Sequence, residues 1–263
     1  MKKTLIAGGL VLAAGLIAPH AQAKPATLAE KPTIVLVHGA FADSSSWNGV
    51  IAALQHDGYT VVAAPDTLRG VRSDADIVAG VVKAIAGPVV LVGHSYGGSV
   101  ISEAAEAAAN VTALVYVAAF APDAGETALG LTGKFPGSTL GPTLAPPVPL
   151  AGGGNDLYIR QALFPAQFAA DVPAAQARLM AAGQRPVKDA ALSEASTAPA
   201  WKHVPSWFVY GDADRNIPPA AMQFMAQRAG ARETLVVKGA SHVVMVSHPV
   251  QVAGLIERAA AAR

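Results

Sequence analysis

A serine between glycines is the feature of this sequence most suited to chemistry. Ser95 lies in Gly93-His-Ser-Tyr-Gly97, after the apolar run 89–92 and before an Ala-rich segment that extends to about residue 109. Gly-x-Ser-x-Gly is common by itself, but between a strand and a helix it forms a sharp turn that exposes the hydroxyl. The helix also points N–H groups at the charge that develops during attack on a carbonyl. We therefore predict that Ser95 is a nucleophile; the alternative is a purely structural glycine-rich turn.

A serine hydroxyl needs a base to remove its proton, and we predict that this base is His242. His242 follows the last apolar strand pattern and precedes the last helical segment, so its loop should reach the sheet edge that carries Ser95. Of the other histidines, two lie beside the proposed site and are expected to be scaffolding, and three resemble surface or helix-start residues: His38 and His94, and His56, His203 and His248.

The base needs a carboxylate that fixes its tautomer and stabilises its charged form. The loop 210–218 offers two. Asp214 is favoured because it lies beyond the strand end, whereas Asp212 is adjacent to the strand and is expected to brace the turn. Asp123, after an earlier strand, is a third alternative. With Asp214, the chain order is serine, aspartate, histidine, which is the order of α/β-hydrolases.

Two backbone N–H groups are expected to stabilise the oxyanion of the intermediate. One belongs to Tyr96, immediately after the nucleophile, and the other to Ala40, in the loop that follows the first core strand. Gly39 should keep that loop close to the nucleophile. Phe41, next in the loop, is predicted to contact a hydrophobic substrate.

The elements that position these residues alternate between strand and helix, which predicts an α/β fold with a parallel sheet covered on both faces. The predicted strands are 33–38, 60–64, 89–92, 113–118, 206–210 and 234–237. The predicted helices are 46–57, 74–86, a segment to about 109, 219–229 and 249–261.

The alternation stops between about residues 121 and 201, which are rich in Gly, Pro and Ala. Helical pieces are expected around 156–170 and 174–182. An insertion this long inside a compact domain is usually functional. We interpret it as a lid over the carboxyl ends of the strands, where open α/β sheets place their sites. The alternative is a partly disordered surface excursion.

The chain resembles the α/β-hydrolase superfamily. Residues 38–41, 93–98 and 118–123 are similar to the branch that contains plant methyl esterases, hydroxynitrile lyases and bacterial relatives. The Gly-x-x-Asp-x-x-x-Pro run 211–218 matches the family's acid loop, which supports Asp214. The resemblance implies an α/β-hydrolase fold with an eight-stranded, mostly parallel sheet, flanking helices and an inserted lid. It also implies an enzyme that uses no cofactor, and we expect no metal ion.

Within that branch, two positions favour ester hydrolysis over cyanohydrin cleavage. The lyases carry a lysine after the catalytic histidine and a threonine in the oxyanion loop, where this chain has Val243 and Gly39. A serine nucleophile also argues against dehalogenases and epoxide hydrolases, which use aspartate. We therefore expect a serine hydrolase that cleaves a small or medium hydrophobic carboxylic ester through an acyl-enzyme. The alternatives are perhydrolase or lyase chemistry on the same residues, or a non-catalytic protein that binds a small ligand.

Composition bounds the remaining possibilities. The 263 residues, 52% of them hydrophobic and 14% charged, suit one large domain. Nineteen Lys and Arg against eighteen Asp and Glu, without a basic stripe, argue against a nucleic-acid partner. The chain has no cysteine, which excludes disulfides and cysteine ligands for metals.

The first residues have the three-part pattern of a secretory signal peptide. Lys2 and Lys3 precede an uncharged run, 5–18, and Ala21-Gln-Ala23 forms a small-x-small cleavage site. We expect cleavage near Ala23, which leaves 24–263 as the hydrolase domain, and export to the periplasm or the medium. The apolar run is shorter than the roughly 20 residues of a spanning helix, so we expect no stable membrane anchor.

Overall fold

The computed structural model describes Met1, Thr4 and residues 31–262. The predicted signal peptide and its cleavage site near Ala23 lie outside the described residues. Residues 31–262 fall within one compact unit, Lys31–Arg263, which carries every other residue singled out from the sequence.

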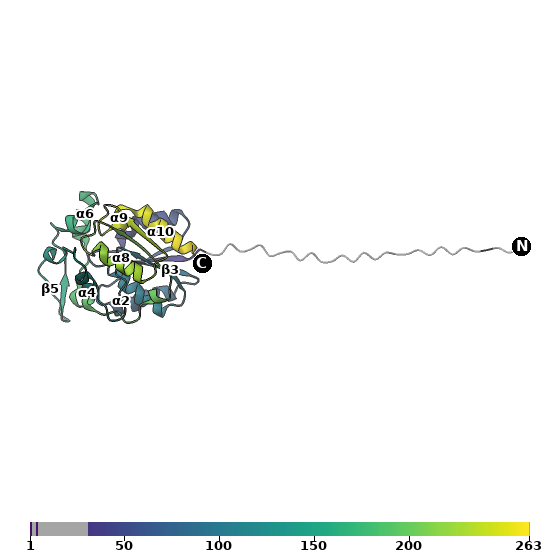
Figure 1. The fold of residues 1–263 in the computed structure, drawn as a ribbon, viewed down its shortest axis with the longest axis horizontal. Coiled ribbons are helices and arrows are strands. Elements are labelled where there is room, and N and C mark those ends of the chain that lie inside the picture. Colours follow the sequence, from purple (N-terminus) through teal and green to yellow (C-terminus); the bar gives the residue numbers. More distant parts are fainter. Residues whose placement is uncertain (2–3, 5–30, 263) are drawn as a thin grey trace. The chain divides into compact units, whose positions relative to one another are not determined.

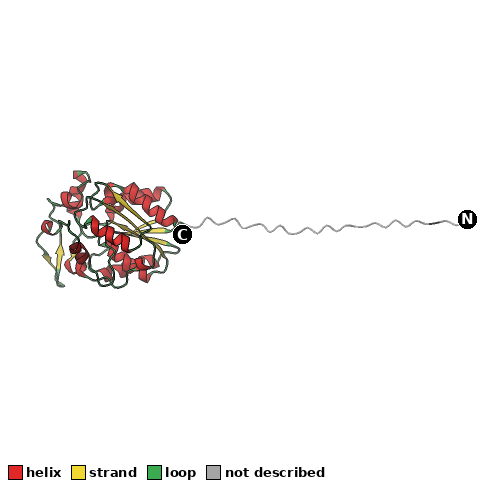
Figure 2. Ribbon diagram, viewed as in Figure 1, coloured by secondary structure: helices red, strands yellow, loops and turns green. Residues whose placement is uncertain are grey.

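A parallel sheet forms the centre of this unit, with helices around it (Figure 2). Its six strands lie in the order β2-β1-β3-β4-β8-β9. The strands are β1 (Thr33–Val37), β2 (Val61–Ala64), β3 (Val89–His94), β4 (Val111–Val117), β8 (Ser206–Gly211) and β9 (Glu233–Val237). Every residue of β3 and β8 is buried, as expected for apolar strands covered on both faces. All six strands predicted from the sequence are confirmed, with small shifts at their ends.

Helices cover both faces of this sheet (Figure 1). The main ones are α1 (Asn48–His56), α2 (Val71–Lys83), α3 (Gly97–Ala104), α8 (Pro219–Arg228) and α10 (Pro249–Ala261), with the short α9 (Val244–Ser247) and the 3₁₀ turns η1 (Ser44–Trp47), η2 (Ala105–Ala107) and η4 (Ala200–Lys202). Helix α1 packs against α10 and α2 packs against α3. Among the described residues, no helix has both the length and the apolar character that crossing a bilayer would require.

The expected eight-stranded sheet is wrong for the described residues, where the main sheet has six strands. Of the continuous described segment, residues 31 and 32 alone precede β1. Strand β1 already has a neighbour on each side, β2 and β3. The other strands of the described chain pair among themselves in a separate sheet and do not extend the central one. The parallel order of the six strands still brings the ends of β3, β8 and β9 to one edge.

The segment between β4 and β8 folds over that edge as a set of short elements. They are α4 (Ala128–Lys134), η3 (Gly141–Thr143), β5 (Val148–Pro149), β6 (Asn155–Leu157), α5 (Phe164–Phe168), α6 (Ala174–Gly183), β7 (Val187–Lys188) and α7 (Asp189–Ser193). Strands β5, β6 and β7 form an antiparallel sheet. The helix expected at 174–182 is confirmed. The helix expected around 156–170 is largely wrong, because β6 occupies its start and α5 begins only next to Pro165.

Two helical glycines allow a matched test of this packing. A Cβ on Gly98, in α3, would collide with the backbone carbonyl oxygen of Phe120, whereas a Cβ on Gly80, in α2, would meet nothing within 4 Å. We expect Gly98→Ala to lower the free energy of unfolding by roughly 1–3 kcal/mol or more. Gly80→Ala should raise it by about 0.5–1 kcal/mol. Urea unfolding followed by circular dichroism measures both, and equal effects would contradict the close approach at Gly98.

Candidate active site

The turn between β3 and α3 holds Ser95 in an unusual backbone conformation. Its φ is +54°, in the left-handed region that residues with a side chain rarely adopt. The flanking glycines make the turn possible, since a Cβ on Gly93 would lie 2.5 Å from the Gly97 carbonyl oxygen. A Cβ on Gly97 would lie 2.7 Å from the His38 carbonyl oxygen. The small residues of the motif are therefore required by backbone contacts, and Ser95 is left at the sheet edge.

Three predicted residues meet at this edge. His242 Nε2 lies 2.9 Å from Ser95 Oγ, and His242 Nδ1 lies 2.7 Å from Asp214 Oδ2. The side chains of His242 and Asp214 are almost completely buried. When the N–H at Nδ1 donates a hydrogen bond to the carboxylate, Nε2 carries no proton. Nε2 can then accept the proton of the serine hydroxyl. The geometry therefore joins a carboxylate, an imidazole and a hydroxyl in one chain of hydrogen bonds.

The structure also separates the three candidate acids. The second oxygen of Asp214 accepts hydrogen bonds from the N–H groups of Asn216 at 2.7 Å and Ile217 at 3.1 Å, which fix its orientation toward His242. Asp212 instead accepts from the N–H of Gly239 at 2.6 Å and braces the turn. Asp123 forms an ion pair with Lys202 at 2.5 Å. Of these three carboxylates, Asp214 is the one that reaches the imidazole.

The two histidines expected to be scaffolding have distinct contacts. His94 Nε2 donates to the carbonyl oxygen of His242 at 3.1 Å, and the two rings lie 4.8 Å apart. Burial lowers the pKa of His94 well below its ordinary value, and the nearby His242 lowers it further. His94 is therefore neutral and can brace His242 without repelling its charged form. His38 Nδ1 donates to the carbonyl of Gly39 at 3.0 Å, and burial lowers its pKa as well.

The other histidines of residues 31–262 do not line the cavity at Ser95. His56 is next to Asp57 on the surface, His203 is 3.4 Å from Glu106, and His248 directly precedes α10. These positions agree with the surface and helix-start roles expected from the sequence.

The loop after β1 lies against the nucleophile. A Cβ on Gly39 would lie 2.6 Å from the Cβ of Ser95, so the loop can approach only with glycine there. The N–H of Phe41 donates to the carbonyl of Arg185 at 3.1 Å and is not free to hold an oxyanion. Ala40 and Tyr96, the two predicted donors, both line the cavity beside Ser95.

A cavity of about 300 Å³ opens at Ser95 and His242, with a predominantly apolar lining. The core contributes the oxyanion loop, the nucleophile turn and the acid loop, and the insertion contributes most of the remaining wall. The lining from the insertion includes Ala128, Leu129, Thr132, Ser138, Leu140, Gly141, Leu144, Leu157, Phe168, Asp189, Leu192 and Ser193. The insertion predicted as a lid thus forms the wall of the site. Two other phenylalanines of the insertion are not among the lining residues: Phe135 packs on Phe224 and Phe164 is fully buried.

Helix α5 of the insertion contacts both loops that carry the acid and the base. The Gln167 amide donates at 2.9 Å to the carbonyl of Arg215 and at 2.9 Å to Asn216 Oδ1, within the loop that holds Asp214. The ring of Phe168 lies 4.9 Å from the ring of His242. Sequence reasoning missed both residues, and the only signal was their place in an apolar stretch of the insertion.

A buried acidic cluster lies behind the nucleophile turn. The hydroxyl of Tyr96 donates to Asp74 Oδ2 at 2.8 Å. Asp66, also fully buried, accepts from the N–H of Leu68 at 3.1 Å, and its second oxygen has no partner among the described residues. Burial raises the pKa of the Asp66 carboxyl well above its ordinary value, and the nearby Asp74 raises it further. Folding therefore favours the protonated form of Asp66.

This pKa shift predicts a pH-dependent stability. Because the folded-state pKa of Asp66 is raised, stability is lost as pH rises above the ordinary value of about 3.9. Asp66→Asn should match the wild type near pH 3.5 and be more stable at pH 8 by more than about 1 kcal/mol. Urea unfolding at both pH values measures this, with Asp76→Asn, at an exposed position, as the control. A difference that does not change with pH would contradict the assignment.

Comparisons with known proteins agree with this architecture. Residues 34–255 match the model of the Alpha/beta hydrolase family. A stretch of 113 residues is 33% identical to a carbendazim hydrolyzing esterase of Nocardioides sp. (strain SG-4G). That match covers 38% of this chain and 47% of the relative, so it spans about half the length of that protein.

Solved structures with the same fold cover most of the chain. Polyneuridine aldehyde esterase has a TM-score of 0.76 at 19% identity and covers 87% of this chain and 99% of its own. A pyrethroid hydrolase from Sphingobium faniae JZ-2 has a TM-score of 0.69 at 22% identity, with 88% and 98% covered. A methylesterase from Arabidopsis has a TM-score of 0.70 at 17% identity, with 88% and 99% covered. The family match over most of its length, on the fold described above, shows that this chain belongs to the alpha/beta hydrolase family.

Proposed function

We propose that this protein is a serine hydrolase that cleaves a small or medium hydrophobic carboxylic ester. The observation that carries the proposal is the hydrogen-bonded series of Asp214, His242 and Ser95 at the wall of an apolar cavity. A serine hydroxyl with an oriented histidine base is the arrangement that acyl transfer requires. The cavity volume of about 300 Å³ suits a small or medium substrate.

In the first step, His242 Nε2 removes the proton of Ser95 as Oγ attacks the ester carbonyl carbon. The carbonyl oxygen becomes negative and accepts hydrogen bonds from the N–H groups of Ala40 and Tyr96. The intermediate collapses, His242 gives its proton to the leaving alcohol, and the acyl group stays on Ser95. Losing one of the two oxyanion donors should lower kcat by roughly 10²–10³-fold.

In the second step, water attacks the acyl-enzyme. His242 takes a proton from the water as the water oxygen bonds to the acyl carbon, and the same N–H groups hold the second oxyanion. The bond between the acyl carbon and Ser95 Oγ then breaks, His242 returns the proton to Oγ, and the carboxylic acid leaves. Asp214 keeps its hydrogen bond to Nδ1 and stabilises the imidazolium. Because Gln167 and Phe168 contact the acid loop and the imidazole, the insertion supports the geometry of both steps.

The lining of the cavity favours a neutral substrate over a charged one. Among the lining residues of the described chain, Asp189 is the one charged side chain outside the triad. None of these lining residues is a lysine or an arginine. Val243, which follows the base, is fully buried and is not part of the lining. A cyanohydrin lyase or a perhydrolase on the same residues would be detected by product analysis with a cyanohydrin or with hydrogen peroxide and an ester.

Export of the mature domain is a further part of the proposal. It is supported by the pattern of residues 1–23, with its lysines, uncharged run and small-residue cleavage site. Amino-terminal sequencing of the protein recovered from the periplasm or the medium tests it. A mature chain that begins near residue 24 supports export, and full-length protein confined to the cytoplasm contradicts it.

Ester hydrolysis should depend on Ser95. We expect the mature protein to hydrolyse p-nitrophenyl acetate and butyrate, and Ser95→Ala to lower kcat by about 10⁴-fold or more, because the nucleophile is lost. Ser99→Ala, one turn further along α3 at another buried serine, is the matched control and should keep most activity. Equal rates in the wild type and Ser95→Ala would overturn the proposal. No turnover in either, together with tight binding of a small ligand, would favour the non-catalytic alternative.

The two aspartates of the acid loop should behave differently. Asp214→Asn leaves the imidazole without a charged partner and should lower kcat by about 10⁴-fold. Asp212→Asn changes a carboxylate that braces the turn and should lower kcat by less than about tenfold. Steady-state kinetics of both variants on p-nitrophenyl butyrate measure the contrast. A larger loss in Asp212→Asn would reverse the assignment of the acid.

A further inference from the structure

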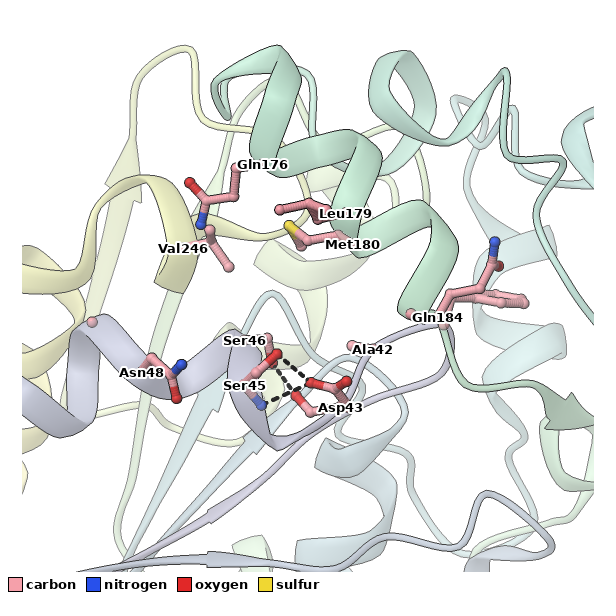
Figure 3. A pocket seen from close by; sticks show the side chains of 13 residues that line it. Ala42, Asp43, Ser45, Ser46, Asn48, Gln176, Leu179, Met180, Gln184 and Val246 are labelled. Atoms are coloured by element: carbon pink, nitrogen blue, oxygen red, sulfur yellow. Dashed lines mark hydrogen bonds between the residues drawn. The ribbon is translucent and has the colours of Figure 1, made fainter.

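A second pocket, of about 330 Å³, is lined by a different set of residues (Figure 3). The segment that follows β1 forms the lower wall of this pocket, with Asp43, Ser45 and Asn48 (Figure 3). Helix α6 of the insertion covers the pocket from the opposite side. Within residues 31–262, Phe41 is the one residue that lines both this pocket and the catalytic cavity. The two spaces are therefore neighbours that meet at a single side chain.

The backbone and the neighbours of Phe41 fix the position of its ring. Its φ of +59° lies in the left-handed region, and its N–H is tied to the carbonyl of Arg185 at 3.1 Å. The ring is 3% exposed and packs edge-on against Phe168, with ring centroids 6.2 Å apart. Phe168 in turn contacts the ring of His242. Phe41 thus belongs to the loop after β1 and is held in place by the insertion, through Arg185 and Phe168, as expected of a partition and not of a mobile surface residue.

We infer that Phe41 is the wall that closes the catalytic cavity toward the second pocket and so limits the length of the ester that this site accepts. The inference rests on the proposed ester hydrolysis and adds the residue that sets its substrate range. With the ring in place, the ester must fit within about 300 Å³. Without the ring, the acyl or alkyl chain of a longer ester can extend past the oxyanion loop into the second pocket.

The lining of the second pocket indicates which kind of ester chain this pocket would accept. Leu179, Met180 and Val246 supply apolar contacts for an aliphatic chain. Asp43 supplies a carboxylate that already accepts hydrogen bonds from Ser45. A neutral alkyl chain fits these side chains, whereas a chain that ends in a carboxylate would be repelled by the charge of Asp43.

The test removes the ring of Phe41 and, in separate variants, fills the second pocket with a new side chain. Phe41→Ala removes the ring, and Phe41→Leu is a milder second variant that keeps an apolar side chain. Gly183→Leu fills the second pocket from α6, where a Cβ would meet nothing within 4 Å. The double variant Phe41→Ala/Gly183→Leu combines both changes. For each protein, kcat/KM is measured on p-nitrophenyl alkanoates from acetate to decanoate and on n-alkyl acetates from ethyl to decyl, with thermal unfolding as the check of folding.

We expect Phe41→Ala to raise the decanoate-to-acetate or the decyl-to-ethyl ratio of kcat/KM by about tenfold or more, and Phe41→Leu to raise it less. Gly183→Leu alone should leave the wild-type ratios unchanged, and in the double variant it should abolish the gain. Unchanged ratios in folded Phe41→Ala and Phe41→Leu would overturn the inference. So would a loss of long-chain turnover in Gly183→Leu alone, because the two spaces would then already be joined. Adding Ser95→Ala to each protein separates the two proposals: turnover that does not need Ser95 contradicts the proposed function, not the wall.

Discussion

Ser95 lies in the left-handed region of φ, between β3 and α3, and neighbouring backbone atoms leave no room for a side chain at Gly93 or Gly97, two positions away on either side. Holding a residue other than glycine there costs on the order of 1–3 kcal/mol, which the surrounding sheet and helix must offset. The same close packing excludes a side chain at Gly39. It therefore fixes the distance between the nucleophile and the oxyanion loop, and the positions of the base and the cavity are defined relative to this turn.

The insertion is part of the catalytic structure as well as a cover over it. Gln167 holds the acid loop through two hydrogen bonds, and Phe168 contacts both the imidazole of His242 and the ring of Phe41. A large displacement of α5 would break these contacts and disturb the hydrogen bond between Asp214 and His242. The orientation of the base and the shape of the cavity are thus coupled through one short helix. Substrate range and catalytic geometry can be expected to change together when α5 is altered.

The central sheet, and the meeting of Ser95, His242 and Asp214 at one of its edges, could be predicted from sequence because both depend on local patterns. Apolar runs predicted the six strands, and position after a strand end distinguished Asp214 from Asp212. The short strands β5–β7 were missed, since two or three residues carry no detectable period. The eight-stranded sheet came from the resemblance and not from strand patterns in this chain. The roles of Gln167 and Phe41 depend on contacts between residues far apart in sequence, which no local pattern reports.

The most direct test of the account is to identify the residue that becomes covalently modified. The mature protein would be treated with a fluorophosphonate, which reacts with activated serines, and the labelled peptide identified by mass spectrometry. The account predicts one label, on Ser95, that appears at the rate at which ester hydrolysis is lost, because the oriented histidine and the oxyanion donors activate that hydroxyl alone. Label on another residue, or full loss of hydrolysis with Ser95 unmodified, would contradict it.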